Sequence, residues 1–217
     1  MIERILQVLK AMKLEPNVIL DIGSRDCVQS LEFAKHYKNA KIIAFECNPN
    51  TIPLCRSNIS GTSNIELVEK AVNTYNGKCT FYAIDQEKTK TTWKDGNPGA
   101  SSLFVSNGAY DVEHYVQNSM MVDCCRVDEV LAEKNIQDVD LVWLDLQGAE
   151  KLAFESFGES LERVKYIHTE VSYKAIYTNQ VMFDELHSFL LAKGFENITI
   201  PSKQGWQEDV IYKNTRF

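Results

Sequence analysis

Apolar residues recur at helical spacing in several stretches of the chain, and short continuous apolar runs separate these stretches. The first pattern is typical of amphipathic helices and the second of buried strands. Up to residue 68 it predicts helices over 2–13, 29–37 and 50–58 and strands over 18–20, 41–45 and 65–68. Strands that alternate with helices imply right-handed crossovers, so we expect an α/β fold with a parallel sheet and helices on both faces.

Residues 78–125 do not follow this alternation. The pattern predicts strands over 78–84 and 103–105 on either side of a polar loop, and a further strand over 120–124. Because this stretch holds too few apolar residues for a core of its own, we expect an elaboration inserted on the sheet. The chain is therefore predicted to form a single domain over 1–217, with its first helix within 1–15.

The alternation returns after residue 126. The pattern there predicts helices over 127–134, 149–157 and 180–193 and strands over 139–146 and 164–171. Two short strands follow, over 197–200 and 209–213, joined by a polar turn. We expect these two strands to form an antiparallel hairpin at the end of the parallel sheet.

Composition narrows the class of protein. Of the 217 residues, 44% are hydrophobic, so a sizeable core can form without disulfides or a metal. The net charge of -7 and the pI near 5.2 argue against a nucleic acid as partner, because phosphate binding favours a basic stripe.

The six cysteines include no C-x-x-C pair, and none of the four histidines lies at zinc-ligand spacing from a cysteine. Free buried thiols in a reducing compartment are therefore expected. Residues 1–13 contain no long apolar run or cleavage site, which predicts neither a signal peptide nor a membrane anchor. We expect a cytoplasmic protein without a membrane partner.

Two strand ends carry candidate chemistry. The first strand ends in Asp21–Cys27, a glycine turn before a helix, which offers backbone N–H groups and space for a ligand. Asp and Gly also end many strands simply to make a turn. Glu46 follows the second strand, 25 residues after Asp21, where a carboxylate can accept hydrogen bonds from both ribose hydroxyls. Together the two features favour a nucleoside-type cofactor.

The turn discriminates between cofactors. A dinucleotide fold needs G-x-G-x-x-G, but only Gly23 is present and Cys27 stands where a later glycine could be. Asp21 would also repel a pyrophosphate, whereas it suits a ligand with an ammonium and a sulfonium group. The sequence therefore favours S-adenosylmethionine over NAD.

Three further acids are expected at the same sheet edge. Asp145 ends one strand, Glu150 begins the next helix, and Glu170 lies near the end of the following strand. Glu150 could instead only complement the helix dipole. We predict that one of the three is the general base of a proton transfer. We assign no metal, although the same acids could hold a divalent ion that binds a diol substrate.

These features in this order resemble the FkbM family of S-adenosylmethionine-dependent methyltransferases, over about residues 17–213. The matching segments are VILDIGSRDC, IIAFECNPN, IELVEKAV, GASSLFVS, CRVDEVL, VDLVWLDLQGAE, YIHTEVS and EDVIYKN. The resemblance implies a class I methyltransferase (Rossmann-like) fold. This fold is a three-layer α/β/α sandwich with a seven-stranded, mostly parallel sheet whose last strand is antiparallel.

The resemblance also implies site residues. The ones that would bind S-adenosylmethionine are Asp21, Gly23, Ser24 and Arg25 at its methionine part, Glu46 at the ribose, Cys47, Asn48, Lys70 and Ala71 around the adenine, and Asp145 near the methyl group. Ser101 and Ser102 match a small-residue loop near the substrate. Cys27 departs from the family, which commonly has glycine there.

The function implied is O-methylation of a hydroxyl on a sugar or small metabolite, with a small-molecule or glycan acceptor as partner. A cofactor-binding protein without catalysis and an NAD-dependent protein are the alternatives. The polar loop over 85–100, with Trp93, is a candidate for the acceptor side, or simply a solvated surface loop.

Overall fold

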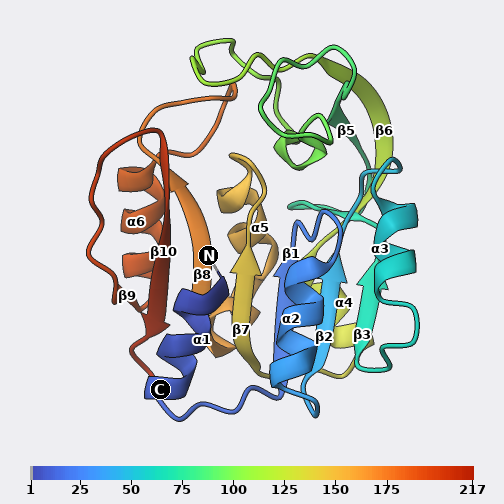
Figure 1. The fold of residues 1–217 in the computed structure, drawn as a ribbon. Helices are drawn as coiled ribbons and strands as arrows, with labels where there is room; N and C mark the ends of the chain where they lie inside the picture. The colour runs from blue at the N-terminus through green and yellow to red at the C-terminus, as the bar shows by residue number, and fades with distance from the viewer. Residues whose placement is uncertain (1) are drawn as a thin grey trace.

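The computed structural model describes residues 2–217. A seven-stranded sheet has the order β3-β2-β1-β7-β8-β10-β9 (Figure 1). Its strands are β1 (Val18–Ile22), β2 (Lys41–Phe45), β3 (Ile65–Val68), β7 (Val139–Leu144), β8 (Val164–Ser172), β9 (Phe195–Asn197) and β10 (Gln207–Asn214). The first five are parallel, and β10 is antiparallel to both of its neighbours. The predicted α/β sheet with its antiparallel terminal hairpin is confirmed.

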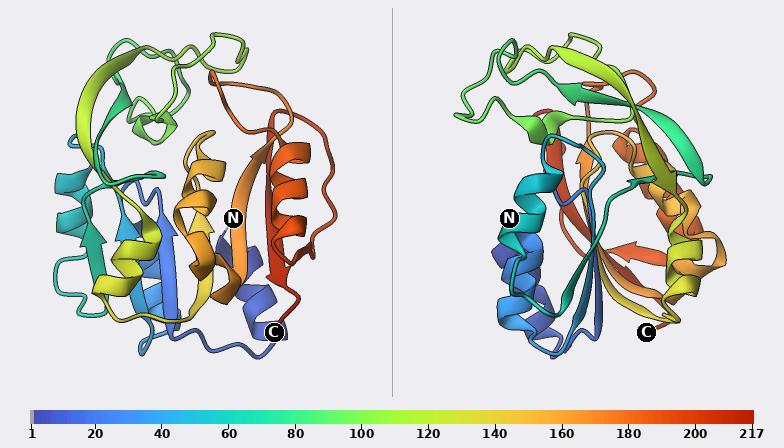
Figure 2. Two further views of the ribbon diagram at one scale, coloured as in Figure 1. Left: turned by 180° about the vertical axis from the view of Figure 1, so that it is seen from behind. Right: turned by 90° about the vertical axis from the view of Figure 1, so that its right-hand side faces the viewer.

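Helices cover both faces of the sheet, and the edge-on view in Figure 2 shows the three layers. One face carries α1 (Ile2–Ala11), α2 (Val28–His36) and α3 (Ile52–Asn58), and the other carries α4 (Val127–Glu133), α5 (Glu150–Ser156) and α6 (Phe183–Ala192). Successive strand residues serve opposite faces. Ile19 packs in the core beneath α1 and α2, whereas Leu20 packs in the core beneath α4 to α6.

The strand order also locates a crevice. The chain crosses from β1 to β2 and β3 on one side, and returns to β7 and β8 on the other side of β1. In such sheets, ligands bind at the carboxyl ends of the strands where the order reverses. Here that point lies between β1 and β7.

A second, smaller sheet formed largely by the inserted residues has the order β4-β6-β5. Its strands are β4 (Ala71–Val72), β5 (Gly77–Ile84) and β6 (Gln117–Cys125). Residues 85–116, which we call the inserted loop, connect β5 to β6 and include the short 3-10 helix η1 (Pro98–Ala100). Figure 1 shows this loop above the carboxyl ends of the parallel strands.

The strand predicted over 103–105 is wrong. Ser102 Oγ donates a hydrogen bond to the Gln147 carbonyl (2.8 Å) and accepts one from Phe104 N–H (3.0 Å). These side-chain bonds, one local and one to a distant segment, take the place of ladder pairing, and only isolated bridges form at Ser102 and Ser106.

Two element boundaries near the C-terminus also differ from the prediction. The strand expected over 197–200 lies over Phe195–Asn197 instead, because Asn197 Oδ1 accepts hydrogen bonds from the backbone and hydroxyl of Thr199 and turns the chain. The helix expected from residue 180 begins at Phe183, since the Gln180 side chain accepts a backbone hydrogen bond from Ile176 (2.7 Å). Another 3-10 helix, η2 (Gly158–Arg163), precedes β8. No helix within residues 2–217 is long and apolar enough to cross a membrane.

Candidate functional site

A pocket of about 550 Å³, counted to its open mouth, lies at the carboxyl ends of β1, β2 and β7. Ten of the residues predicted for the site line it: Gly23, Arg25, Glu46, Cys47, Asn48, Lys70, Ala71, Ser101, Ser102 and Asp145. Asp21, Ser24, Glu150 and Glu170 do not line this pocket.

The glycine turn after β1 forms one side of this pocket. Gly23 has a φ of 88°, and a Cβ at this position would lie 1.9 Å from the carbonyl oxygen of Asp145. The N–H groups of Gly23 and Ser24 both donate to the Phe45 carbonyl (3.0 and 2.9 Å). Glycine is therefore required where the loop after β1 passes the end of β7. Cys27 itself adopts a φ of 60°, so the turn forms with cysteine where the family commonly has glycine.

Asp21 and Ser24 lie behind the turn. Asp21 is fully buried, and its Oδ2 accepts a hydrogen bond from Ser30 Oγ of α2 (2.5 Å). Oδ1 has no hydrogen-bond partner within residues 2–217, and burial raises the pKa of this carboxyl to about 6. Ser24 Oγ donates to the Asp21 carbonyl (2.9 Å). This placement lets both residues support the turn from its α2 side.

Glu46 lies in a nest of backbone donors. Its Oε2 accepts a hydrogen bond from Arg25 N–H (2.7 Å), and its Oε1 accepts from Cys47 and Asn48 N–H (2.8 and 2.7 Å). Burial raises the pKa of this carboxyl to about 7, although the three backbone donors oppose the shift. Ser101 Oγ accepts from Asn48 Nδ2 (3.4 Å) and from Ile84 N–H (3.0 Å), which attaches the inserted loop to this wall.

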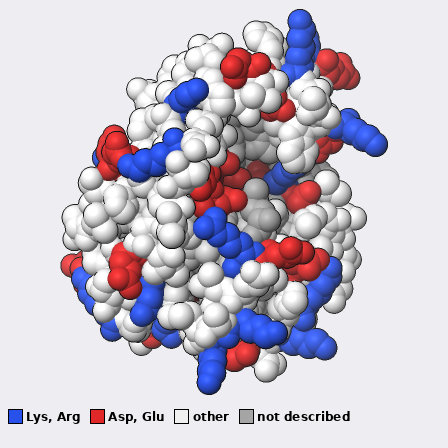
Figure 3. Space-filling view, turned by 60° about the vertical axis from the view of Figure 1, so that its left-hand side comes forward, with Lys and Arg blue, Asp and Glu red and all other residues white. Residues whose placement is uncertain are grey.

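A second cleft adjoins the pocket, with about 1090 Å³ of empty space including its mouth. The two share Gly23, Arg25, Gly99 and Asp145. The polar and aromatic side chains of this second cleft are Trp93, Tyr110, Tyr115, Trp143, Arg25, Gln29, Thr92, Asn97, Gln147, Gln207, Glu113, Asp145 and Glu170. Figure 3 shows a hollow on this side of the molecule with Asp and Glu side chains gathered in it.

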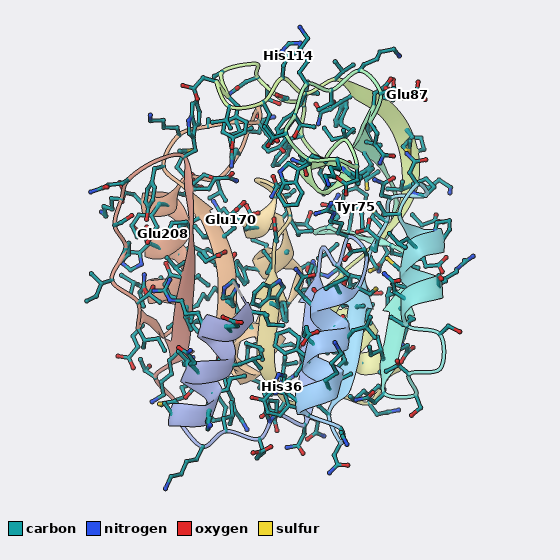
Figure 4. The ribbon with its side chains drawn as sticks, in the orientation of Figure 1. His36, Tyr75, Glu87, His114, Glu170 and Glu208 are labelled. Atoms are coloured by element: carbon teal, nitrogen blue, oxygen red, sulfur yellow. The ribbon has the colours of Figure 1, made fainter. Side chains whose placement is uncertain are left out.

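One amide connects two acids in this cleft. Gln147 Nε2 donates to Asp145 Oδ1 (2.7 Å) and to Glu170 Oε2 (3.2 Å). Gln207 Nε2 donates to the same oxygen of Glu170 (2.5 Å), and Tyr177 OH donates to Gln147 Oε1 (3.1 Å). Figure 4 shows Glu170 near the end of β8, beneath the inserted loop. Asp145 and Glu170, two of the three acids that the sequence predicts at this sheet edge, thus both bond to Gln147.

Both acids have raised pKa values. Burial raises the pKa of Asp145, and the Gln147 hydrogen bonds and the Arg25 charge oppose this shift. Burial, together with the charges of Asp145 and Glu150, raises the pKa of Glu170 well above its ordinary value. Two buried acids that share one hydrogen-bond donor titrate as a coupled pair, and such a pair is a candidate for acid–base chemistry.

Glu150 lines neither cleft. Its Oε1 accepts hydrogen bonds from the N–H groups of Leu146 and Gly148 (3.1 and 3.0 Å), so it holds the loop that carries Gln147. Burial raises its pKa to about 7. This geometry favours Asp145 and Glu170 over Glu150 as the proton acceptor. Among residues 2–217, no group of three or more His, Cys, Asp or Glu side chains is arranged to hold a metal ion.

His168 is a core residue, as its position deep in an apolar strand predicts, but the expectation that it is hydrogen-bonded is wrong, because neither ring nitrogen has a partner within residues 2–217. Its ring stacks on Trp143 with centroids 3.7 Å apart and planes 1° apart, and burial lowers its pKa to about 3. The neutral ring supports Trp143 from beneath the second cleft.

Sequence reasoning missed Gln147, Gln207, Tyr110 and Tyr177. Gln147 stands inside the motif D-x-Q-G-A-E and could have been singled out, because an amide between two strand-end acids can bond to both. The other three come from distant segments, and no local pattern marks them.

The sheet order, the three layers and the crevice at the strand ends define the class I methyltransferase fold. A methyltransferase FkbM from Methylobacillus flagellatus KT has a TM-score of 0.54 at 9% identity, covering 92% of this chain and 44% of that one. Magnesium protoporphyrin IX methyltransferase from Synechocystis PCC 6803, solved with bound S-adenosylmethionine, has a TM-score of 0.53 at 9% identity and covers 99% of this chain and 78% of that one. Likeness at such low identity shows the fold alone.

The family follows from the sequence. The model of the methyltransferase FkbM domain matches residues 20–196, so the chain belongs to the FkbM methyltransferase family. It is also 26% identical to the 2-O-methyltransferase NoeI of Sinorhizobium fredii (strain NBRC 101917 / NGR234) over 216 residues, which cover 97% of this chain and 84% of that protein.

Proposed function

We propose that this methyltransferase uses S-adenosylmethionine to methylate a hydroxyl group of a sugar or a similar small, neutral, polyhydroxylated acceptor. The observation that carries the proposal is that the two clefts share Asp145 and the glycine turn. A cofactor in the first cleft and an acceptor in the second would meet at these residues.

The residues of the cofactor pocket fit S-adenosylmethionine. Glu46 is a buried acid whose position at the end of β2 suits a ribose diol, and the apolar side chains of Phe45, Phe81 and Leu103 offer a surface for a purine. Only one glycine opens the turn, and the buried Asp21 carboxyl behind it disfavours a pyrophosphate. When bound, the cofactor supplies a methyl group on a sulfonium.

The second cleft suits an uncharged acceptor with several hydroxyls. Aromatic faces such as those of Tyr110 and Tyr115 can pack against the C–H face of a sugar ring, and the amides of Asn97 and Gln207 can bond to neighbouring hydroxyls. The carboxyls of Asp145 and Glu170 disfavour an anionic acceptor. The name of the relative, a 2-O-methyltransferase, supports oxygen as the methylated atom.

The chain's own residues then position reactants and move one proton. The aromatic walls orient the acceptor, and alignment of this kind supplies much of the catalysis of a displacement. The Asp145–Glu170 pair accepts the hydroxyl proton, and Gln147 keeps both carboxyls in place.

Calorimetry with S-adenosylmethionine, S-adenosylhomocysteine and NADH tests the cofactor. We expect the first two to bind and NADH not to bind. Transfer of labelled methyl groups to neutral sugars, N-acetylated sugars and uronic acids then tests the acceptor class, and we expect transfer to the neutral compounds. Tight NADH binding without S-adenosylhomocysteine binding would exclude methyl transfer, and preferred labelling of uronic acids would exclude the acceptor class.

A further inference from the structure

Arg25 stands at the boundary of the two clefts and lines both of them. Its backbone is fixed from two sides, because its N–H donates to Glu46 Oε2 (2.7 Å) and its carbonyl accepts from Cys55 Sγ of α3 (3.1 Å). It also has a φ of 55°. The turn therefore sets the direction in which the Arg25 side chain leaves the backbone.

The side chain of Arg25 reaches into the inserted loop. Its guanidinium pairs with the Asp95 carboxylate and lies over the Trp93 ring, with Cζ 5.1 Å from the ring centre. Its Cδ passes so close to Gly99 that a Cβ there would lie 3.1 Å away. A planar guanidinium can pair and stack at once, which a lysine ammonium cannot do equally well.

Residues 91–97 have few other attachments to the methyltransferase sheet. Their remaining hydrogen bonds and ion pairs in the described chain stay within the inserted loop, chiefly from Thr91 and Asn97 to Glu113 and from Gln86 to the Asp95 carbonyl. Trp93 is 54% exposed, so burial does not hold it in place. The Arg25 contacts are therefore the polar link between residues 91–97 and the glycine turn after β1.

We propose that Arg25 is a positioning residue that couples the two sites: an occupied cofactor pocket fixes residues 91–97 in place and so completes the acceptor cleft. The inference rests on the proposed function, because S-adenosylmethionine is taken to occupy the first cleft. A ligand in that cleft would pack against the Arg25 side chain, which lines it, and would hold the guanidinium against Asp95 and Trp93. Cofactor would then bind before acceptor.

Limited trypsin digestion of the full chain measures this coupling without an acceptor. Lys90 and Lys94 are exposed and lie beside or within residues 91–97, so trypsin cleavage after them reports that this segment has come away from the sheet. In the wild type, we expect saturating S-adenosylhomocysteine to slow this cleavage at least fivefold. In Asp95→Ala, which alters neither cleft's lining, we expect the Kd for S-adenosylhomocysteine to stay within threefold while protection falls below twofold.

Two further variants sharpen the result. Arg25→Lys keeps a charge for Asp95 but loses the stacking on Trp93, so its protection should be intermediate. Asp123→Ala removes a more exposed ion pair, with Lys78 between β5 and β6 and away from both clefts, and should behave as the wild type.

Full protection in Asp95→Ala, or no protection in a wild type that binds S-adenosylhomocysteine, would overturn the coupling and leave the proposed function standing. A wild type that binds no S-adenosylhomocysteine would overturn the proposed function as well.

Discussion

At the scale of single residues, Gln147 connects the two acids Asp145 and Glu170. Its amide donates to Asp145 and Glu170, and its own oxygen accepts from Tyr177, so each of its polar atoms has a defined partner. The two acids therefore approach without a cation between them, and burial keeps their proton affinity high. In the proposed mechanism, the acid pair rather than either acid alone is therefore the unit that accepts the proton.

Replacement of either Asp145 or Glu170 by its amide should slow proton transfer. We expect Glu170→Gln to lower kcat by about 10²–10⁴-fold, the usual contribution of a general base, with the Kd for S-adenosylhomocysteine unchanged within threefold. Asp145→Asn should lower kcat similarly and also weaken cofactor binding, because Asp145 lines both clefts. Steady-state kinetics and calorimetry measure these effects. Glu208→Gln is the control, since Glu208 bonds to Tyr173 on another face, and unchanged turnover in both acid variants would refute the assignment.

Glu46 should determine cofactor affinity. In Glu46→Gln, an amide group replaces one oxygen and faces backbone N–H donors, so the ribose loses its carboxylate acceptor. We expect the Kd for S-adenosylhomocysteine to rise at least tenfold, about 1.4 kcal/mol. Glu69→Gln is the matched control, because Glu69 also follows a strand but pairs with Arg56 at the surface. Equal affinities in the two variants by calorimetry would contradict a ribose role.

Glu150 should give the apoprotein a measurable pH dependence. Its pKa rises from 4.5 to about 7 in the folded state, so the native protein binds this proton more tightly than the unfolded chain does. Its contribution to stability is complete below pH 4.5 and is lost as the pH rises through 7. Gln at this position keeps an acceptor for Leu146 and Gly148 N–H without titrating. The stability of Glu150→Gln relative to wild type should therefore rise between about pH 4.5 and 8, by about 3 kcal/mol at most.

Urea unfolding at several pH values measures that difference, in which titrating groups that do not interact with Glu150 cancel; the coupled acids Asp145 and Glu170 contribute to it as well. A difference that stays flat with pH would show that burial does not raise this pKa.

At the scale of elements, the turn after β1 and the end of β7 form one structural unit. The Asp145 N–H donates to the Ile22 carbonyl (3.0 Å), and the Asp145 carbonyl lies where a Gly23 Cβ would be. Asp145 and the glycine turn are thus fixed relative to each other by backbone contacts. This contact explains why position 23 requires glycine.

Gly23→Ala should separate this close approach from ordinary backbone strain. Gly61 also has a positive φ (85°), but no atom lies within 4 Å of the place that a Cβ would take there, so Gly61→Ala costs only the strain of the backbone, about 1 kcal/mol. At Gly23 the added Cβ meets the β7 backbone, and we expect a loss of more than about 3 kcal/mol. Urea unfolding of both variants measures the costs. Similar values would mean that the turn can move away from β7.

The elements and strand-end acids could be predicted from the sequence because they depend on local patterns. Alternating strands and helices indicated the parallel sheet, and Glu46, Asp145 and Glu170 each end or approach the end of an apolar strand. Asp21 shows the limit of this reasoning. It precedes the turn by two residues, and strand alternation directs its side chain to Ser30 of α2 rather than to the pocket.

The second cleft could not be predicted, because its walls depend on the path of a long connection. Tyr110 and Gln207 come from distant parts of the sequence. They line one cleft only because the inserted loop folds back over the end of β8 and the start of β10. The strand expected over 103–105 failed for a related reason. The Ser102 hydroxyl bonds to Gln147, a partner 45 residues away.

At the scale of the whole molecule, the inserted residues depend on the main sheet. The core of the second sheet contains six buried residues, Ala71, Cys79, Phe81, Ala83, Val122 and Cys124. A cluster of this size cannot offset the entropy of ordering about 50 residues. The proposed cofactor pocket is also lined by both the main sheet, at the end of β1, and the inserted loop.

The chain should therefore unfold as one unit, and cofactor product should stabilise all of it. We expect thermal unfolding followed by far-ultraviolet circular dichroism to coincide with unfolding followed by the fluorescence of Trp93 in a variant whose other two tryptophans are phenylalanine. S-adenosylhomocysteine at about 100 times its Kd should add about 2.7 kcal/mol. For a chain of this size that raises Tm by about 5–10 °C.

Both probes should shift together, because the ligand would contact the sheet and the inserted loop at once. An inserted loop that melts first, with a midpoint insensitive to S-adenosylhomocysteine, would show that it is an independent unit and that the cofactor pocket closes without it. Coincident shifts would instead make the inserted loop part of the cofactor site, as the shared lining of the two clefts requires.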